Sequence, residues 1–112
     1  MTRAPLFNSR LAKSFEIEHF DPLAGDGGRV IRYHITVGYY ADGKTIGEVF
    51  VTPLGKAGRG SMLEALARDA AVLISLATQH GCPLETQRRA ITRDEQNRPL
   101  TLVGAVLDAM EG

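Results

Sequence analysis

The sequence predicts an α+β domain, in which a three-stranded antiparallel meander packs on one long helix and two short helices follow. Three observations lead to this prediction. Alternating apolar and polar residues fill the first half, and a helix with clear start and stop signals spans residues 62–80. The length of 112 residues, with 44% hydrophobic and 23% charged, suits one globular domain. We expect an N-terminal arm at 1–13 and a single domain at 14–112.

Strands are predicted at residues 14–20, 29–40 and 45–54. In the second of these, alternate residues should line one face of the sheet, namely Ile31, Tyr33, Ile35, Val37 and Tyr39. Residues 21–28 are dense in turn formers, and Ala41-Asp42-Gly43-Lys44 matches a tight hairpin turn. This order of strands and turns predicts a meander.

The long helix carries its own boundaries. Ser61 and Glu64 match a capping box, while Gly81 and Pro83 end the helix. Its apolar arc is about twice the ~100° of an ordinary surface helix. The sheet should therefore cover one side, and either the C-terminal helices or a second copy the other. Asp69 projects into this arc. It is either a structural aspartate, paired with an arginine or placed at a helix edge, or a carboxylate with a functional role.

The last third of the chain predicts two short helices. The first spans residues 84–92, with Pro83 at a tolerated first-turn position, and a charged turn occupies 93–99. Thr101 is expected to cap the last helix, whose apolar face comprises Leu102, Val103, Val106, Leu107 and Met110.

Composition excludes several classes of function. Thirteen basic residues balance thirteen acidic ones, so no broad electrostatic footprint for nucleic acid or a membrane surface exists. A single cysteine excludes an intrachain disulfide and favours the cytoplasm, and the first fifteen residues lack a signal peptide's apolar core. We expect a cytoplasmic protein that does not bind nucleic acid.

No catalytic residue, metal site or cofactor site is predicted. The three histidines, His19, His34 and His80, are scattered and have no metal-ligand spacing with Cys82. A cysteine at the end of a helix is more often a buried structural residue than a reactive thiol. A basic segment near the C-terminal helices is either a solvated face or a contact for nucleic acid or a nucleotide, and it comprises Arg88, Arg89, Arg93 and Arg98.

The strand-to-helix turn GKAGRGS is the candidate ligand site. Free N–H groups at a helix N-terminus favour anions, and Lys56 and Arg59 would add positive charge. The candidate anion-binding residues are Gly55, Lys56, Gly58, Arg59, Gly60 and Ser61. The alternative is a tight turn that needs glycine only for backbone freedom.

The run GEVFVTPLGKAGRGSMLEALARDAAVLISLATQHGCPLE resembles the TSCPD domain at the C-terminal end of cobalamin-dependent (class II) ribonucleotide reductases. The resemblance rests on Glu48, Val49 and Phe50, on Gly55, Lys56 and Gly58, and on residues 64–68, 74–77 and 80–85. The tail NRPLTLVGAVLDAM is similar to the ending of short stand-alone bacterial proteins of this kind.

The resemblance implies an accessory domain and not a complete reductase. A reductase of this kind needs a radical-bearing cysteine, a reducible cysteine pair and a large barrel, whereas this chain has one cysteine, and the Thr-Ser-Cys-Pro-Asp motif is absent. The first hypothesis is an accessory or regulatory domain of ribonucleotide reduction that binds a nucleotide or phosphate at the candidate anion site. The second is a reductase-linked activity for which another polypeptide supplies the cysteines. The third is a homodimeric protein-interaction module without a small ligand.

Overall fold

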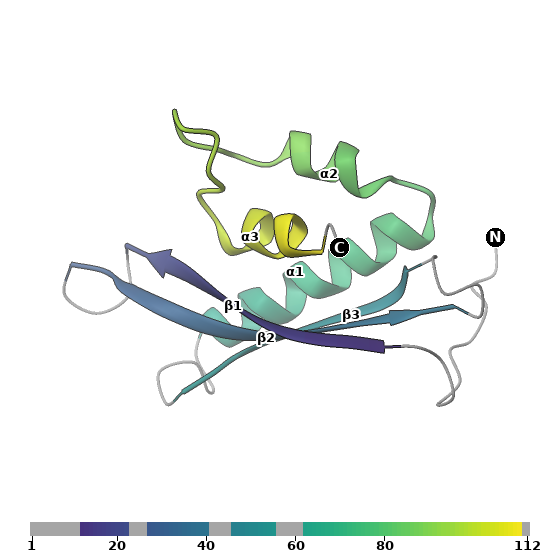
Figure 1. Ribbon diagram of the computed structural model, residues 1–112, viewed down its shortest axis with the longest axis horizontal. Helices are drawn as coiled ribbons and strands as arrows, with labels where there is room; N and C mark the ends of the chain where they lie inside the picture. Colours follow the sequence, from purple (N-terminus) through teal and green to yellow (C-terminus); the bar gives the residue numbers. More distant parts are fainter. Residues whose placement is uncertain (1–11, 23–26, 41–45, 56–61, 111–112) are drawn as a thin grey trace.

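The computed structural model describes residues 12–22, 27–40, 46–55 and 62–110. Its strands are β1 (Ala12–Asp21), β2 (Arg29–Tyr39) and β3 (Ile46–Pro53), and its helices are α1 (Met62–Gln79), α2 (Leu84–Ala90) and α3 (Leu102–Ala109). The strands form one antiparallel sheet in the order β1-β2-β3, and the helices follow (Figure 1). The predicted α+β meander on a long helix is confirmed.

The sheet follows from the period-two pattern of β2, the central strand. Ile31, Tyr33, Ile35 and Val37 are buried, and Tyr39 is partly buried against the core, which confirms the predicted apolar face. β3 pairs with β2 from Tyr33↔Pro53 to Tyr39↔Ile46, and the register shifts by one residue beside Gly38.

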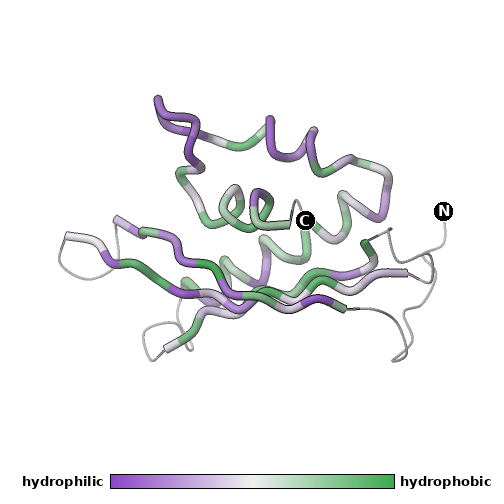
Figure 2. Tube along the Cα trace, viewed as in Figure 1, coloured by the Kyte–Doolittle hydropathy of each residue, from purple (hydrophilic) through white to green (hydrophobic). Residues whose placement is uncertain are grey.

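All three helices lie on the same face of the sheet (Figure 1). α1 packs chiefly over β3, while α3 lies against α1, α2 and β1. The core between these layers joins the buried face of β2 to small and branched side chains of the helices, namely Ala67, Ala71, Ile74, Val106, Leu107 and Met110. Hydropathy along the chain shows the same division, with the segment between α2 and α3 strongly hydrophilic (Figure 2).

The opposite face of the sheet carries polar side chains between β1 and β2. Arg32 pairs with Glu16 at 3.2 Å, and the hydroxyls of Ser14 and Thr36 lie 3.0 Å apart. Both contacts are exposed, so they fix cross-strand register more than they add stability.

The end of α1 is built as the sequence predicts. Gly81 has φ +92°, its N–H donates to the carbonyl of Thr78, and the N–H of Cys82 donates to the carbonyl of Ala77. These two bonds make a Schellman motif, which needs a left-handed residue at this position. The predicted cap Ser61, the hairpin turn 41–44 and part of the turn 21–28 lie outside the described residues.

The C-terminal helices require one correction. Thr101 occupies the N-cap position of α3 with an extended backbone, but its hydroxyl makes no capping hydrogen bond. Thr101 is exposed, so water can satisfy the first-turn N–H groups that the side chain leaves free. α2 ends at Ala90, and the predicted turn follows it, with Asn97 at φ 65°.

Candidate functional site

The sequence-predicted anion site lies almost wholly outside the described residues. Only Gly55 is described, and it is exposed with φ +88°, a conformation that suits glycine. α1 begins at Met62, directly after the segment that holds Lys56, Gly58, Arg59, Gly60 and Ser61. The geometry of that site therefore stays a prediction.

The histidines and the cysteine do not come together. His19 lies on β1, His34 on β2, and His80 at the end of α1. Cys82 is partly exposed, and its thiol lies 3.9 Å from the carbonyl of Pro83. Among the described residues no cluster of three metal-ligating side chains exists.

The basic segment is engaged within the chain. Arg93 binds Asp108 through two parallel hydrogen bonds of 2.7 and 3.0 Å, Arg98 binds Asp94 at 2.9 Å, and Arg89 binds Glu85 at 2.5 Å. Arg88 donates to the carbonyl of Leu107 at 3.4 Å. Arg88 and Arg93 thus join the 84–99 segment to α3, whereas Arg89 and Arg98 make exposed pairs within that segment.

Two of these pairs lower carboxyl pKa values. Hydrogen bonding from Arg93 holds the pKa of Asp108 below its ordinary value, against an opposing effect of burial. The backbone N–H of Arg98 is the largest cause of the lowered pKa of Asp94. Both carboxyls are held in their charged form by the turn that joins α2 to α3.

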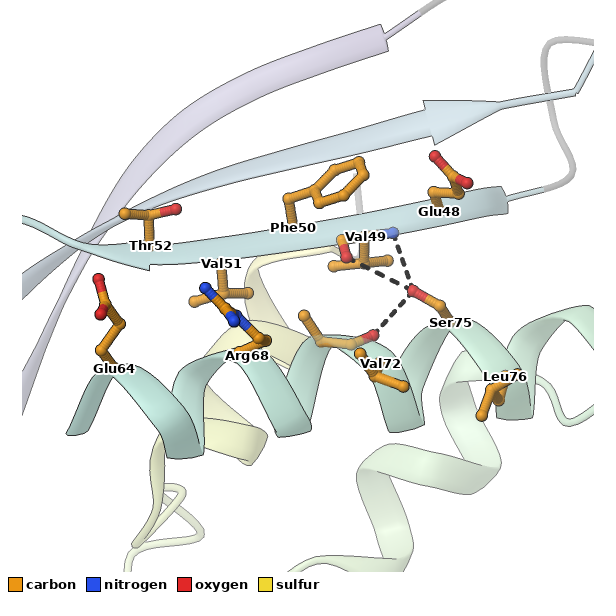
Figure 3. Close-up of a pocket in the computed structure, with 11 residues that line it drawn as sticks. Glu48, Val49, Phe50, Val51, Thr52, Glu64, Arg68, Val72, Ser75 and Leu76 are labelled. Atoms are coloured by element: carbon orange, nitrogen blue, oxygen red, sulfur yellow. Dashed lines mark hydrogen bonds between the residues drawn. The ribbon is translucent and has the colours of Figure 1, made fainter. Parts of the chain in front are cut away.

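A groove runs between the free edge of β3 and α1 (Figure 3). Val51 lies between the strand and the helix at its base, and Glu64 and Arg68 line it from α1. Phe50 and Thr52 border it from β3, with their side chains on the side of the strand away from α1. The groove has a volume of about 470 Å³, and it places the carboxylate of Glu64 and the guanidinium of Arg68 beside an apolar base.

Side chains of α1 bond backbone groups of Gly47 and Val49 on this edge. Ser75 is 8% exposed, and its hydroxyl accepts the N–H of Val49 at 2.9 Å while donating to the carbonyl of Ala71 at 2.7 Å (Figure 3). Gln79 donates to the carbonyl of Gly47, and Pro53 has no N–H to offer. Edge groups that already have partners are poor templates for another strand, so extension of the sheet is disfavoured at Gly47 and Val49.

A second groove lies on the other side of α1, toward the start of α3 and the end of β1. It encloses about 650 Å³, and its walls include Leu66, Asp69, Leu73 and Leu102. Tyr33 lies at its base, where burial, with a smaller contribution from Asp21, raises the pKa of its phenol to about 12. The phenol is therefore neutral at any physiological pH.

Between the two grooves α1 presents an exposed apolar surface, which we call the α1 ridge. It comprises Met62, Leu66, Val72, Leu73 and Leu76, each more than two fifths exposed. The sequence predicts an apolar arc that needs two covers. The sheet and α3 bury Ala67, Ala70, Ala71 and Ile74, but no described element covers the ridge. Asp69 lies on the same exposed side, with no ion pair to another described residue.

The fold and these surfaces define a class: a small α+β domain with an open apolar helix face, whose described residues contain no metal-ligand cluster. A family model for the TSCPD domain matches residues 23–109. The chain therefore belongs to the TSCPD domain family, which is associated with ribonucleotide reductases. No curated protein and no solved structure matches it. In the described part of the chain no helix is long and apolar enough to cross a membrane.

Proposed function

We propose that this chain is an accessory protein of ribonucleotide reduction that works by binding protein, with the α1 ridge as its contact surface. The observation that carries the proposal is the exposure of five large apolar side chains along one helix. Contiguous apolar surface of this kind is uncommon on monomeric proteins and is typical of contact sites.

The chemistry of the chain supports the same role. With one cysteine it has no reducible cysteine pair, and membership in the TSCPD family supplies the link to ribonucleotide reductase. We place the protein in the cytoplasm, where a single free thiol is stable and the reduction of ribonucleotides takes place.

The test is binding to the ribonucleotide reductase of the same organism, followed by co-elution in gel filtration. Leu73→Glu places a charge on the α1 ridge, where Leu73 is 66% exposed, so the fold should tolerate it. Val30→Glu is the matched control, because Val30 is 53% exposed on β2 and does not belong to the ridge. We expect the wild type and Val30→Glu to bind, and Leu73→Glu to bind at least about tenfold more weakly. Equal binding by all three proteins would show that the α1 ridge is not the contact surface.

A second candidate function is recognition of a nucleotide or phosphate at Gly55, Lys56, Gly58, Arg59, Gly60 and Ser61. It is favoured by the start of α1 at Met62, because the first turn of a helix presents free N–H groups. Thermal-shift titration with ribonucleotides, deoxyribonucleotides and phosphate tests it. A ligand at 100 times its dissociation constant should stabilise the wild type by about 2.7 kcal/mol, and Lys56→Ala/Arg59→Ala should abolish the shift. No shift in melting temperature with any ligand would contradict ligand binding at this segment and leave it as a structural turn.

A further inference from the structure

The α1 ridge contains a seam with a symmetric spacing. Asp69 and Leu73 are four residues apart, Leu73 and Leu76 three, and Leu76 and His80 four. Alternating steps of three and four are the spacing with which one helix packs along another. All four side chains are exposed, with Leu73 at 66% and Leu76 at 43%. Because the spacing reads the same from either end, the seam can pair with an inverted copy of itself.

The charges at the ends of the seam limit what can cover it. Neither Asp69 nor His80 makes an ion pair with another residue in the described ranges. A carboxylate that is covered without a partner is costly, so whatever packs on Leu73 must bring a donor to Asp69. His80 carries N–H groups that can donate to a carboxylate. The seam thus has at one end the group that the other end needs.

We propose that a second copy of this chain packs antiparallel on α1, with Asp69 of each subunit opposite His80 of the partner subunit. This inference rests on the proposed function, since it takes the α1 ridge as a surface that binds protein, and it concerns the chain in the absence of the reductase, when a second copy covers the ridge. A two-fold axis between residues 74 and 75 then places Leu73 against Leu76 of the partner subunit, and the reverse pair follows by symmetry. Four leucines form the centre, and an Asp–His pair closes each end.

Charge selects this register over its neighbours. An antiparallel pairing displaced by seven residues places Leu66 against Leu76 of the partner subunit, but it covers Asp69 with the partner's Leu73 and leaves the carboxylate unpaired. A parallel pairing brings the two Asp69 carboxylates together, which is repulsive. Extension of the sheet through β3 is also disfavoured, because Ser75 and Gln79 already occupy backbone groups of that edge.

The experiment uses two full-length variants, Asp69→Lys and His80→Glu, each measured alone and after mixing by light scattering and native mass spectrometry. Alone, Asp69→Lys sets an ammonium group against the partner's His80, and His80→Glu sets two carboxylates together. We expect each to weaken self-association at least about tenfold. The mixture contains one Lys–Glu pair and one Asp–His pair, so a heterodimer should form with nearly the wild-type dissociation constant.

Met62→Lys is the control for register. Met62 is 74% exposed and lies outside the α1–α1 overlap of the proposed register, whereas the displaced register sets it against the partner's His80. We expect Met62→Lys to leave self-association unchanged. A dimer that Met62→Lys weakens, or a mixture that yields no heterodimer, would overturn the register. A monomeric wild type would overturn the inference altogether, while binding of the reductase through the ridge would still decide the proposed function separately.

Discussion

At the scale of single residues, Ser75 shows why a polar side chain lies within an apolar helix. Its hydroxyl bonds the N–H of Val49 across the layer between helix and sheet and the carbonyl of Ala71 within α1. Glu64, Arg68, Ser75 and Gln79 form the polar stripe of α1, which lies beside the edge of β3, with Ser75 buried and Arg68 still exposed. The stripe therefore positions the helix on the sheet.

Ser75→Ala should destabilise the protein, because it leaves the buried N–H of Val49 without an acceptor. The expected loss is about 1–3 kcal/mol in the free energy of unfolding, measured in urea. Ser14→Ala is the matched control, since it removes an exposed hydroxyl that bonds Thr36 and should cost no more than about 0.5 kcal/mol. Equal stability of the two variants would show that the Ser75 bond contributes nothing.

The Arg93–Asp108 pair predicts a dependence on pH. The pKa of Asp108 is lower in the folded protein than its ordinary value, so its contribution is present at neutral pH and is lost as the pH falls through the folded value. At pH 7 Asp108→Asn should lower the melting temperature by a few degrees. The difference from the wild type should shrink below about pH 4, where the free carboxyl protonates. A difference that stays constant with pH would contradict this account of the pair.

At the scale of elements, α3 is fixed by a close approach to the turn before it. Gly104 is buried, and a Cβ at this position would lie 2.5 Å from the Cδ1 of Ile91 and from the Cβ of Pro99. The missing side chain thus lets the helix pack directly on residues 91–99. Glycine is needed at position 104 for this close contact and not for its backbone conformation, because the φ of Gly104 lies outside the left-handed region.

Gly104→Ala should therefore destabilise the fold although alanine is the better helix former. The clash costs about 1–3 kcal/mol, against a gain of about 0.5–1 kcal/mol in helix propensity. Adding Ile91→Val removes the Cδ1 atom and should recover part of the loss, which thermal unfolding of the single and double variants measures. A rise in melting temperature for Gly104→Ala alone would refute this packing.

Sequence patterns predicted those features of the helices and strands that depend on neighbouring residues. Alternation predicted the buried face of β2, and Gly81 and Pro83 predicted the end of α1, because both signals lie within a few neighbouring residues. The prediction that the Thr101 side chain caps α3 was wrong, because a capping hydrogen bond depends on the direction of the hydroxyl, which the sequence does not reveal. The groove beside β3 gave no signal, because its central bond joins Val49 to Ser75, 26 residues apart.

At the scale of the whole molecule, the one-sided arrangement of the helices explains the α1 ridge. A three-stranded sheet offers one apolar face, and α1 and α3 share it, so the far side of α1 has no sheet to cover it (Figure 1). The sequence predicted the need for two covers and left the second open between the C-terminal helices and another copy. α3 contacts α1 but leaves the ridge exposed, and we infer that a second copy of the chain covers it.

The most direct measurement of this claim is the solution mass of the wild type and of Leu73→Glu, determined by light scattering over a range of concentrations. The account predicts that the wild type has the mass of two chains and that Leu73→Glu has the mass of one, with unchanged circular dichroism. A wild type with the mass of a single chain at every concentration, or a dimer that Leu73→Glu leaves intact, would contradict it.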